Sequence, residues 1–145
     1  MEIPVYVTTD EVKRVCQALN IRDWTGLTEA KVLPDEAEII LAEAKPAGMN
    51  IDLEDFQTGL EVELEHGLHD PEVNVTNNHP ILTGKIVLAH LKESLDYYKR
   101  LEVVELEGDL LKATLAENPA KVKSIYRRLA QAKRVLARTE ADQLA

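Results

Sequence analysis

Apolar residues recur every three or four positions along most of the chain, and this spacing predicts a protein built of helices. The first helix is expected over residues 9–19, because Thr8 and Glu11 form a capping box at its start. A second is expected over residues 34–44, with acidic residues in its first turn, where the helix dipole favours negative charge. Trp24 is expected to anchor the irregular stretch between them.

Two longer helices are predicted in the middle of the chain. One covers residues 52–66 and is expected to stop at the glycine that follows. The other starts at Pro80 or Thr83 and continues through Tyr98, with an extension to Glu107 left open. The polar stretch between them is rich in Asn, His and Asp, which is typical of a loop.

The end of the chain predicts a long amphipathic helix. Asn118 and Pro119 suit a cap and a first helical position, and the helix is expected to run to about Arg138. Its apolar residues form a coiled-coil-like seam at spacings of three and four. They are Val122, Ile125, Leu129, Ala132 and Leu136.

Taken together, the pattern predicts a mainly α fold, a small bundle of about five or six helices with a protruding amphipathic C-terminal helix. Residues 3–7 form a short strand or an extended arm in this interpretation, since Pro4 excludes a central strand. A further helical segment is expected over residues 110–116. The predicted division is an acidic helical domain over residues 1–117 and a basic helix over residues 118–145.

Charge supports that division. The net charge is −9, but residues 118–145 carry seven basic and two acidic groups, whereas the rest carries 10 basic and 24 acidic groups. Such a split favours an interaction tail or a self-complementary assembly, and a solvated helix face is the plainer alternative.

Cysteine content and hydropathy bear on location. The lone Cys16 cannot form an internal disulfide and lies among apolar residues, so we expect a small buried side chain in a reducing compartment. Neither a signal peptide nor an apolar run of membrane-spanning length is evident, which predicts an intracellular protein with no membrane association.

One cluster of ionisable residues lies on the two middle helices. Glu63 and His66 share one helix flank, and His90 and Glu93 share another, each pair three residues apart beside an apolar face. Imidazole and carboxylate groups suit zinc, iron or manganese, so these four are candidate metal ligands. The second motif is reversed and the extra glutamates of a di-iron bundle are missing, so a hydrogen-bonded Glu–His network that needs no cofactor is the favoured interpretation.

The loop between these helices superficially resembles a calcium loop over residues 70–76. The glycine and the bidentate acid of such loops are replaced by Val75 and Ile81, so turn and capping roles are expected instead. His69 and His79, at the ends of the loop, are interpreted as free surface histidines.

Several motifs occur in a fixed order, namely GLEVELEHG at residues 59–67, DPEVNVT at 70–76, TGKIVLAHLKE at 83–93 and DYYKRL at 96–101. Together they resemble a small domain family of unknown function found in bacteria and in tailed phages or prophages. The resemblance covers about residues 53–102. It implies a helical core and a viral or mobile-element origin, and with that origin a location in the cytoplasm of a bacterial host or in a virion. It assigns no reaction.

These observations favour a non-enzymatic structural or interaction protein, associated with a virus or prophage, over an enzyme. In this hypothesis the last helix binds a protein partner or a second copy through its apolar seam, while its basic groups meet an acidic surface. The candidate residues are Val122, Ile125, Leu129 and Leu136 for the seam, and Arg127, Arg128, Lys133 and Arg134 for the charge. The alternative is a metal-binding protein or metal-dependent enzyme that uses the Glu–His cluster. An acidic nucleic-acid mimic is weaker, and direct DNA binding is disfavoured by the acidic body and the lack of a base-reading motif.

Overall fold

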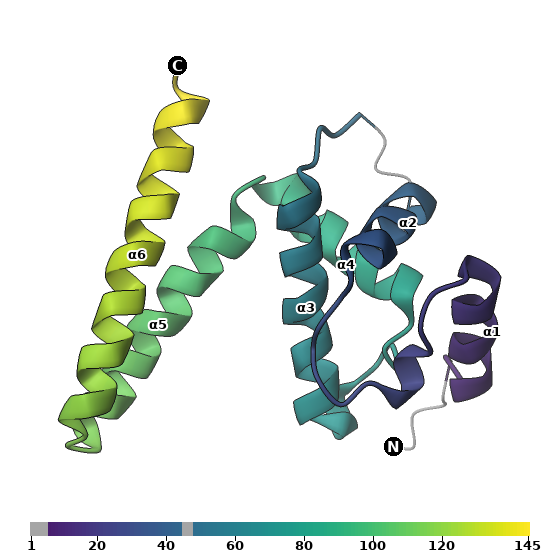
Figure 1. Cartoon of the computed structure of the whole chain (residues 1–145), viewed down its shortest axis with the longest axis horizontal. Helices are drawn as coiled ribbons and strands as arrows, with labels where there is room; N and C mark the ends of the chain where they lie inside the picture. The colour runs from purple at the N-terminus through teal and green to yellow at the C-terminus, as the bar shows by residue number, and fades with distance from the viewer. Residues whose placement is uncertain (1–5, 45–47) are drawn as a thin grey trace. The chain divides into compact units, whose positions relative to one another are not determined.

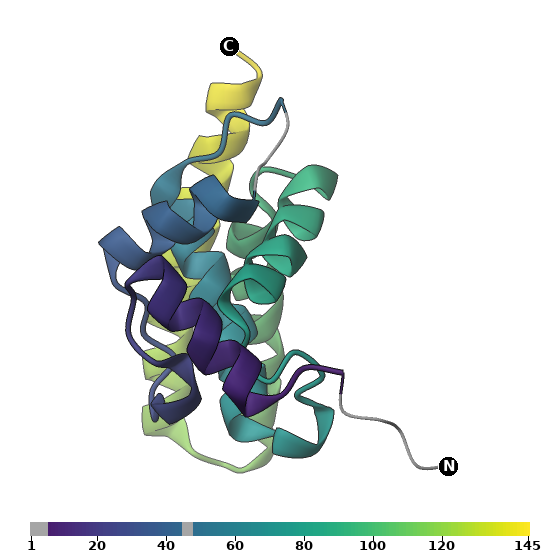
Figure 2. The same cartoon turned by 90° about the vertical axis from the view of Figure 1, so that its right-hand side faces the viewer.

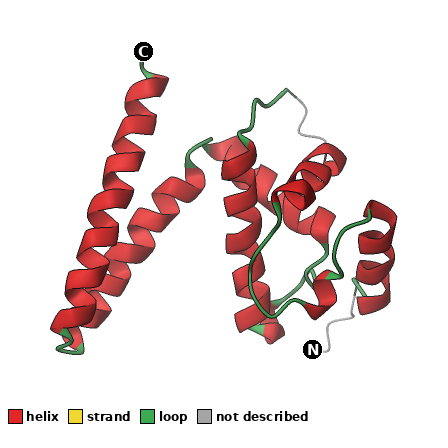
Figure 3. Ribbon diagram, viewed as in Figure 1, coloured by secondary structure: helices red, strands yellow, loops and turns green. Residues whose placement is uncertain are grey.

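The computed structural model describes residues 6–44 and 48–145, and these residues form helices and loops without a strand (Figure 3). The mainly α prediction is therefore confirmed. The predicted strand or arm at residues 3–7 falls mostly outside the described residues, and Tyr6 and Val7 form a bend. In chain order the elements are α1 (Thr9–Leu19), η1 (Trp24–Gly26), α2 (Pro34–Ala44), α3 (Leu53–His69), η2 (Pro71–Val73), α4 (Pro80–Glu93), α5 (Tyr97–Leu115) and α6 (Pro119–Gln143).

The chain divides into two compact units, Met1–Leu95 and Asp96–Ala145. The boundary differs from the one that charge and periodicity suggest, between residues 117 and 118. The reason is that α5 buries its apolar side on α6, so both helices belong to the same unit. They run side by side as a helical hairpin closed by a short turn (Figure 1).

In the first unit, α2, α3 and α4 pack against one another, and α1 lies beside η1 and α4 (Figure 2). The core of this unit contains five fully buried side chains, those of Ile40, Phe56, Leu60, Leu64 and Val87. Trp24 is fully buried, as the sequence predicts for the anchor of its loop. At Gly84, α4 approaches α2 and α3 closely, because a Cβ there would lie 2.8 Å from Ile40 Cγ2 and 3.4 Å from Phe56 Cζ.

Local capping explains where the helices start. The Thr8 hydroxyl accepts a hydrogen bond from the Glu11 amide at 3.2 Å, as the capping box predicts. The Asn118 side chain accepts one from the Lys121 amide at 3.0 Å and starts α6 at Pro119. The C-terminal helix is long, as predicted, although it is paired with α5 along the hairpin.

The predicted helix through Tyr98 is wrong, because it is interrupted after Glu93. Ser94 is extended, with φ −156° and ψ 130°, and its amide donates to the His90 carbonyl. Helix α5 then begins at Tyr97 and runs without a break to Leu115, so the segment expected separately at residues 110–116 is the end of this helix.

Asp96, which directly precedes α5, is buried, and only 1% of its surface is exposed. The Arg100 guanidinium donates to both of its carboxylate oxygens, at 2.8 and 2.7 Å. The same guanidinium lies 2.8 Å from Glu140 near the end of α6, so it ties the two ends of the hairpin together. An additional ion pair of 2.6 Å joins Lys133 to Glu107 farther along the hairpin.

None of the helices in the described part combines the length and apolar character that a membrane span requires.

Candidate functional site

The Glu–His cluster is only partly assembled in the first unit. His90 Nε2 lies 3.5 Å from Glu63 Oε1, so α4 and α3 do bring one histidine and one glutamate together. Their side chains are 31% and 17% exposed. This contact joins the two helices in the way that the hydrogen-bonded network interpretation predicts.

The other two members of the cluster, His66 and Glu93, are solvent-exposed. Within residues 6–44 and 48–145, no three His, Cys, Asp or Glu side chains are grouped so that they could hold a metal ion. A structural zinc site normally uses four protein ligands. The Glu63–His90 pair therefore offers half of such a set, and metal binding stays a prediction.

The Asn-rich loop is organised by its own side chains. Asn74 Nδ2 donates to the Gly67 carbonyl at 3.1 Å and to Asn78 Oδ1 at 3.0 Å. A Cβ on Gly67 would overlap Asn78 Oδ1, so the loop approaches the helix backbone closely at this glycine. The prediction that the helix stops at Gly67 is wrong, because α3 continues to His69. Asn77 donates to the Val7 carbonyl at 3.3 Å, and so ties the loop to the chain just before α1. Turn and capping roles account for this loop.

His79 is not a free surface histidine, because only 9% of it is exposed. Its Nδ1 accepts hydrogen bonds from the amides of Ile81 and Leu82, at 3.2 and 3.4 Å, and so caps α4. Burial lowers the pKa of His79 below its ordinary value, which keeps the ring neutral and able to accept. His69, by contrast, is exposed as expected.

A buried carboxylate that the sequence analysis did not single out organises the loop before α2. Glu36 is 3% exposed and accepts from Arg22 Nε at 2.9 Å, Arg22 Nη2 at 2.7 Å and the Leu33 amide at 3.0 Å. Burial by itself would raise the pKa of Glu36, but these hydrogen bonds outweigh it, and the pKa lies below its ordinary value. The group is therefore an ionised structural anchor.

Cys16 is 1% exposed, and burial raises the pKa of its thiol. A buried thiol with a raised pKa is a poor nucleophile, which agrees with the structural role expected from the sequence.

In the second unit, the apolar seam of α6 faces α5. Val122, Ile125 and Leu129 pack with Leu106 and Ala113 of α5. Leu136 is half-buried farther along the helix. The seam predicted to meet a partner is thus largely covered within the chain.

The basic residues of α6 have different surroundings. Lys133 is paired with Glu107, and Arg134 donates to Gln131 at 2.6 Å. Arg127 and Arg128 are exposed, and neither has an ion-pair partner in the part of the chain that the structure describes.

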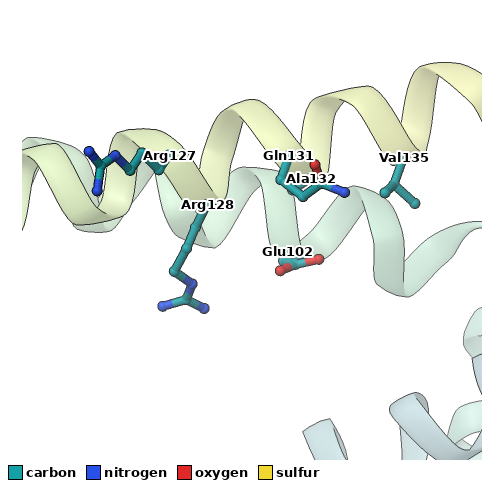
Figure 4. A pocket seen from close by; sticks show the side chains of 6 residues that line it. All are labelled: Glu102, Arg127, Arg128, Gln131, Ala132 and Val135. Carbon is teal, nitrogen blue, oxygen red and sulfur yellow. The ribbon is translucent and has the colours of Figure 1, made fainter.

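Both of these arginines border a groove of about 310 Å³ on the hairpin surface. Figure 4 shows Arg128 and Glu102 extending to the same side of the helix pair, with Arg127 and Val135 at opposite ends. The groove is lined by Glu102, Arg127, Arg128, Gln131, Ala132 and Val135. An apolar floor with a basic rim is suited to a partner segment that carries both apolar and acidic side chains.

Sequence reasoning identified the two arginines but missed Glu102, Gln131 and Val135. The missing information was the pairing of α5 with α6, which places Glu102 opposite the groove residues of α6.

A comparison with family models matches residues 12–107 to a family described as a protein of unknown function, DUF5661. The chain belongs to the DUF5661 family. The match is wider than the resemblance over residues 53–102, and it extends from α1 into the middle of α5. Helix α6, with the two groove arginines, lies beyond the segment that defines DUF5661 in this chain. Comparisons with curated proteins and with solved structures give no match.

Proposed function

We propose that this DUF5661 protein is a non-enzymatic interaction protein that binds an acidic segment of a protein partner through the groove of its C-terminal hairpin. The partner belongs to a phage or prophage, and the protein acts as a virion or assembly component. The observation that carries the proposal is the exposure of Arg127 and Arg128 at the rim of an apolar groove.

Charge complementarity supports the choice of an acidic partner. Two guanidinium groups without ion-pair partners among the described residues raise the local positive potential, and Glu102 is the one acidic residue lining the groove. Arginine is also favoured at interfaces, because its planar head binds carboxylates with two hydrogen bonds and its stem packs on apolar surface.

The proposal of a non-enzymatic protein is supported by the structural roles of the ionisable groups in the first unit. His79 caps a helix, Glu36 holds Arg22 and a loop amide, and His90 contacts Glu63 across two helices. Each therefore has a role in holding elements together.

A matched pair of charge reversals tests the groove. The variant Arg127→Glu/Arg128→Glu should lose a partner from phage-infected or prophage-induced host extract that the unchanged protein retains. The control Lys121→Glu/Lys123→Glu carries the same charge change on exposed positions of the same helix and should retain the partner. Retention should also weaken with salt, because an interaction between exposed charges is screened. Equal retention by the two variants contradicts the groove as the binding site.

Genomic context tests the viral part of the proposal. Flanking portal, capsid or tail genes are the expected result, and the protein should be found by mass spectrometry in purified particles. If the gene lies among cellular operons and purified particles lack the protein, the viral origin is contradicted. The proposal that the groove binds an acidic partner segment is unaffected by that result.

Metal binding by the first unit is the second candidate, favoured by the 3.5 Å approach of Glu63 to His90. Metal analysis of protein purified without a histidine tag tests it. About one zinc, iron or manganese ion per chain, lost in a His90→Ala variant, is the result that supports a site. Metal content unchanged by that substitution rejects it.

A further inference from the structure

Helix α5 has a second apolar side that its own hairpin does not cover. Val104, Leu111 and Leu115 are 62%, 60% and 76% exposed. Buried Leu106 and Ala113, by contrast, pack on α6. One helix thus presents apolar residues both to its partner in the hairpin and to solvent.

The exposed residues are arranged in a regular stripe. Their positions alternate at spacings of three and four residues, which is the repeat of a coiled-coil seam. We define this α5 stripe as Leu101, Val104, Gly108, Leu111 and Leu115. At 100° per residue, the stripe lies about 160° around the helix from the side that packs on α6.

Gly108 occupies the middle of the stripe. It lies in the interior of α5, where glycine weakens a helix relative to alanine by about 1 kcal/mol. A Cβ at this position would meet no atom within 4 Å, so packing inside the chain does not require a glycine there. A glycine in an open stripe permits another helix to approach its backbone closely.

We propose that the α5 stripe binds the same stripe of a second copy of this chain, in antiparallel orientation, with the two-fold axis near Gly108. In this arrangement Leu101 faces Leu115 of the partner subunit, and Val104 faces Leu111 of the partner subunit. Because the stripe and the side that packs on α6 lie on nearly opposite sides of α5, the two hairpins together form a layer of four helices with the two copies of α5 in the middle. This face is separate from the groove, so the proposal does not depend on the proposed function.

Charges beside the stripe favour this orientation. Glu105 and Lys112 lie on the same flank, three residues before and four residues after Gly108. A two-fold axis near Gly108 places Glu105 opposite Lys112 of the partner subunit, and the symmetry repeats the pair. Lys112 pairs with Asp109 at 3.2 Å within the chain, but its side chain is 79% exposed, so it is free to exchange that contact.

The other flank is compatible with the same arrangement. Glu107 lies near the axis, where it would meet its own symmetry copy. Its 2.6 Å ion pair with Lys133 offsets that repulsion. A parallel arrangement would instead pair Glu105 with Arg100 of the partner subunit, although Arg100 already bonds Asp96 and Glu140.

The test is the molar mass of the full chain over a range of concentrations, measured by sedimentation or light scattering. The unchanged protein should approach twice the chain mass of 16.3 kDa as the concentration rises. Leu111→Lys should hold it at the single-chain mass. Tyr126→Lys, which removes a 63% exposed aromatic residue of α6 outside the stripe, should leave the dimer intact.

Two further variants separate failure of the interface from failure of the fold. Gly108→Gln fills the close-approach position with a good helix former, so it should abolish the dimer while the helical circular dichroism signal stays equal or rises. Lys112→Glu alone should weaken the dimer at least tenfold, and the double swap Glu105→Lys/Lys112→Glu should restore it. A chain that is monomeric at every concentration, or a dimer insensitive to Leu111→Lys, overturns the proposal. Failure of the double swap to restore association overturns the antiparallel pairing.

Discussion

Replacing Glu36 by Gln tests the most heavily bonded charge in the first unit. The carboxylate accepts four hydrogen bonds, two at each oxygen. Arg22 donates from its amide at 3.1 Å and from its guanidinium at 2.9 and 2.7 Å, and the Leu33 amide donates at 3.0 Å. Glutamine has nearly the same shape, but its NH₂ group cannot accept, so at least one oxygen's pair of hydrogen bonds is lost.

The cost follows from those two lost hydrogen bonds. Hydrogen bonds to charged groups contribute about 1.5–3 kcal/mol each. The Arg22 side chain is 40% exposed, so water compensates part of the loss. We expect Glu36→Gln to lower the free energy of unfolding by about 2–3 kcal/mol, a large share of the about 5–15 kcal/mol typical of a domain.

Urea unfolding followed by far-UV circular dichroism measures this change, with Glu38→Gln as the matched control. Glu38 is exposed on the same helix, and its substitution should stay within about 0.5 kcal/mol. The folded pKa of Glu36 lies below its ordinary value of 4.5, so the stabilisation is fully present above pH 4.5 and is lost as the pH falls through the folded pKa. Acid should therefore destabilise the unchanged protein more than the variant. A Glu36→Gln protein within 0.5 kcal/mol of the unchanged one refutes the reasoning.

Two other substitutions test the packing and capping of the first unit. Gly84→Ala should lower the free energy of unfolding, because overpacking against Ile40 costs about 1–3 kcal/mol, more than the helix propensity of alanine returns; a raised melting temperature would contradict the close approach. His79→Ala should cost about 1 kcal/mol of cap stability. Since the pKa of His79 is lowered in the folded protein, its contribution to the free energy of unfolding is present above pH about 6.5 and is lost as the pH falls through the folded pKa. An NMR titration that gives a pKa above 6.5 would refute the buried neutral cap.

Signals that act over a few residues were predictable from the sequence. The capping box at Thr8, the proline start of α2 and the Asn118–Pro119 start of α6 each depend on neighbours within one turn. These local signals, together with the apolar periodicity, therefore predict where the three helices begin without knowledge of any tertiary contact.

Features that depend on distant contacts were not predictable. The apolar period continues across residues 94–96, so the break before α5 gives no signal in the pattern. The seam of α6 was predicted to meet a partner or a second copy, but it packs on α5, and periodicity alone does not specify which helix covers it. Glu63 pairs with His90, and among the described residues no third His, Cys, Asp or Glu is placed to hold a metal ion with them. This pairing depends on the register of α3 and α4, which the loop at residues 70–79 sets through its own hydrogen bonds.

Site-specific photo-crosslinking in cells that produce the protein tests the central claim, that the hairpin groove binds a protein partner, most directly. A photoreactive residue at Gln131, inside the groove, should give an adduct with one partner protein. The adduct should disappear in the Arg127→Glu/Arg128→Glu background, and the same residue at Ala130, exposed on another side of α6, should give none. No adduct from Gln131, or equal adducts from both positions, would contradict the claim.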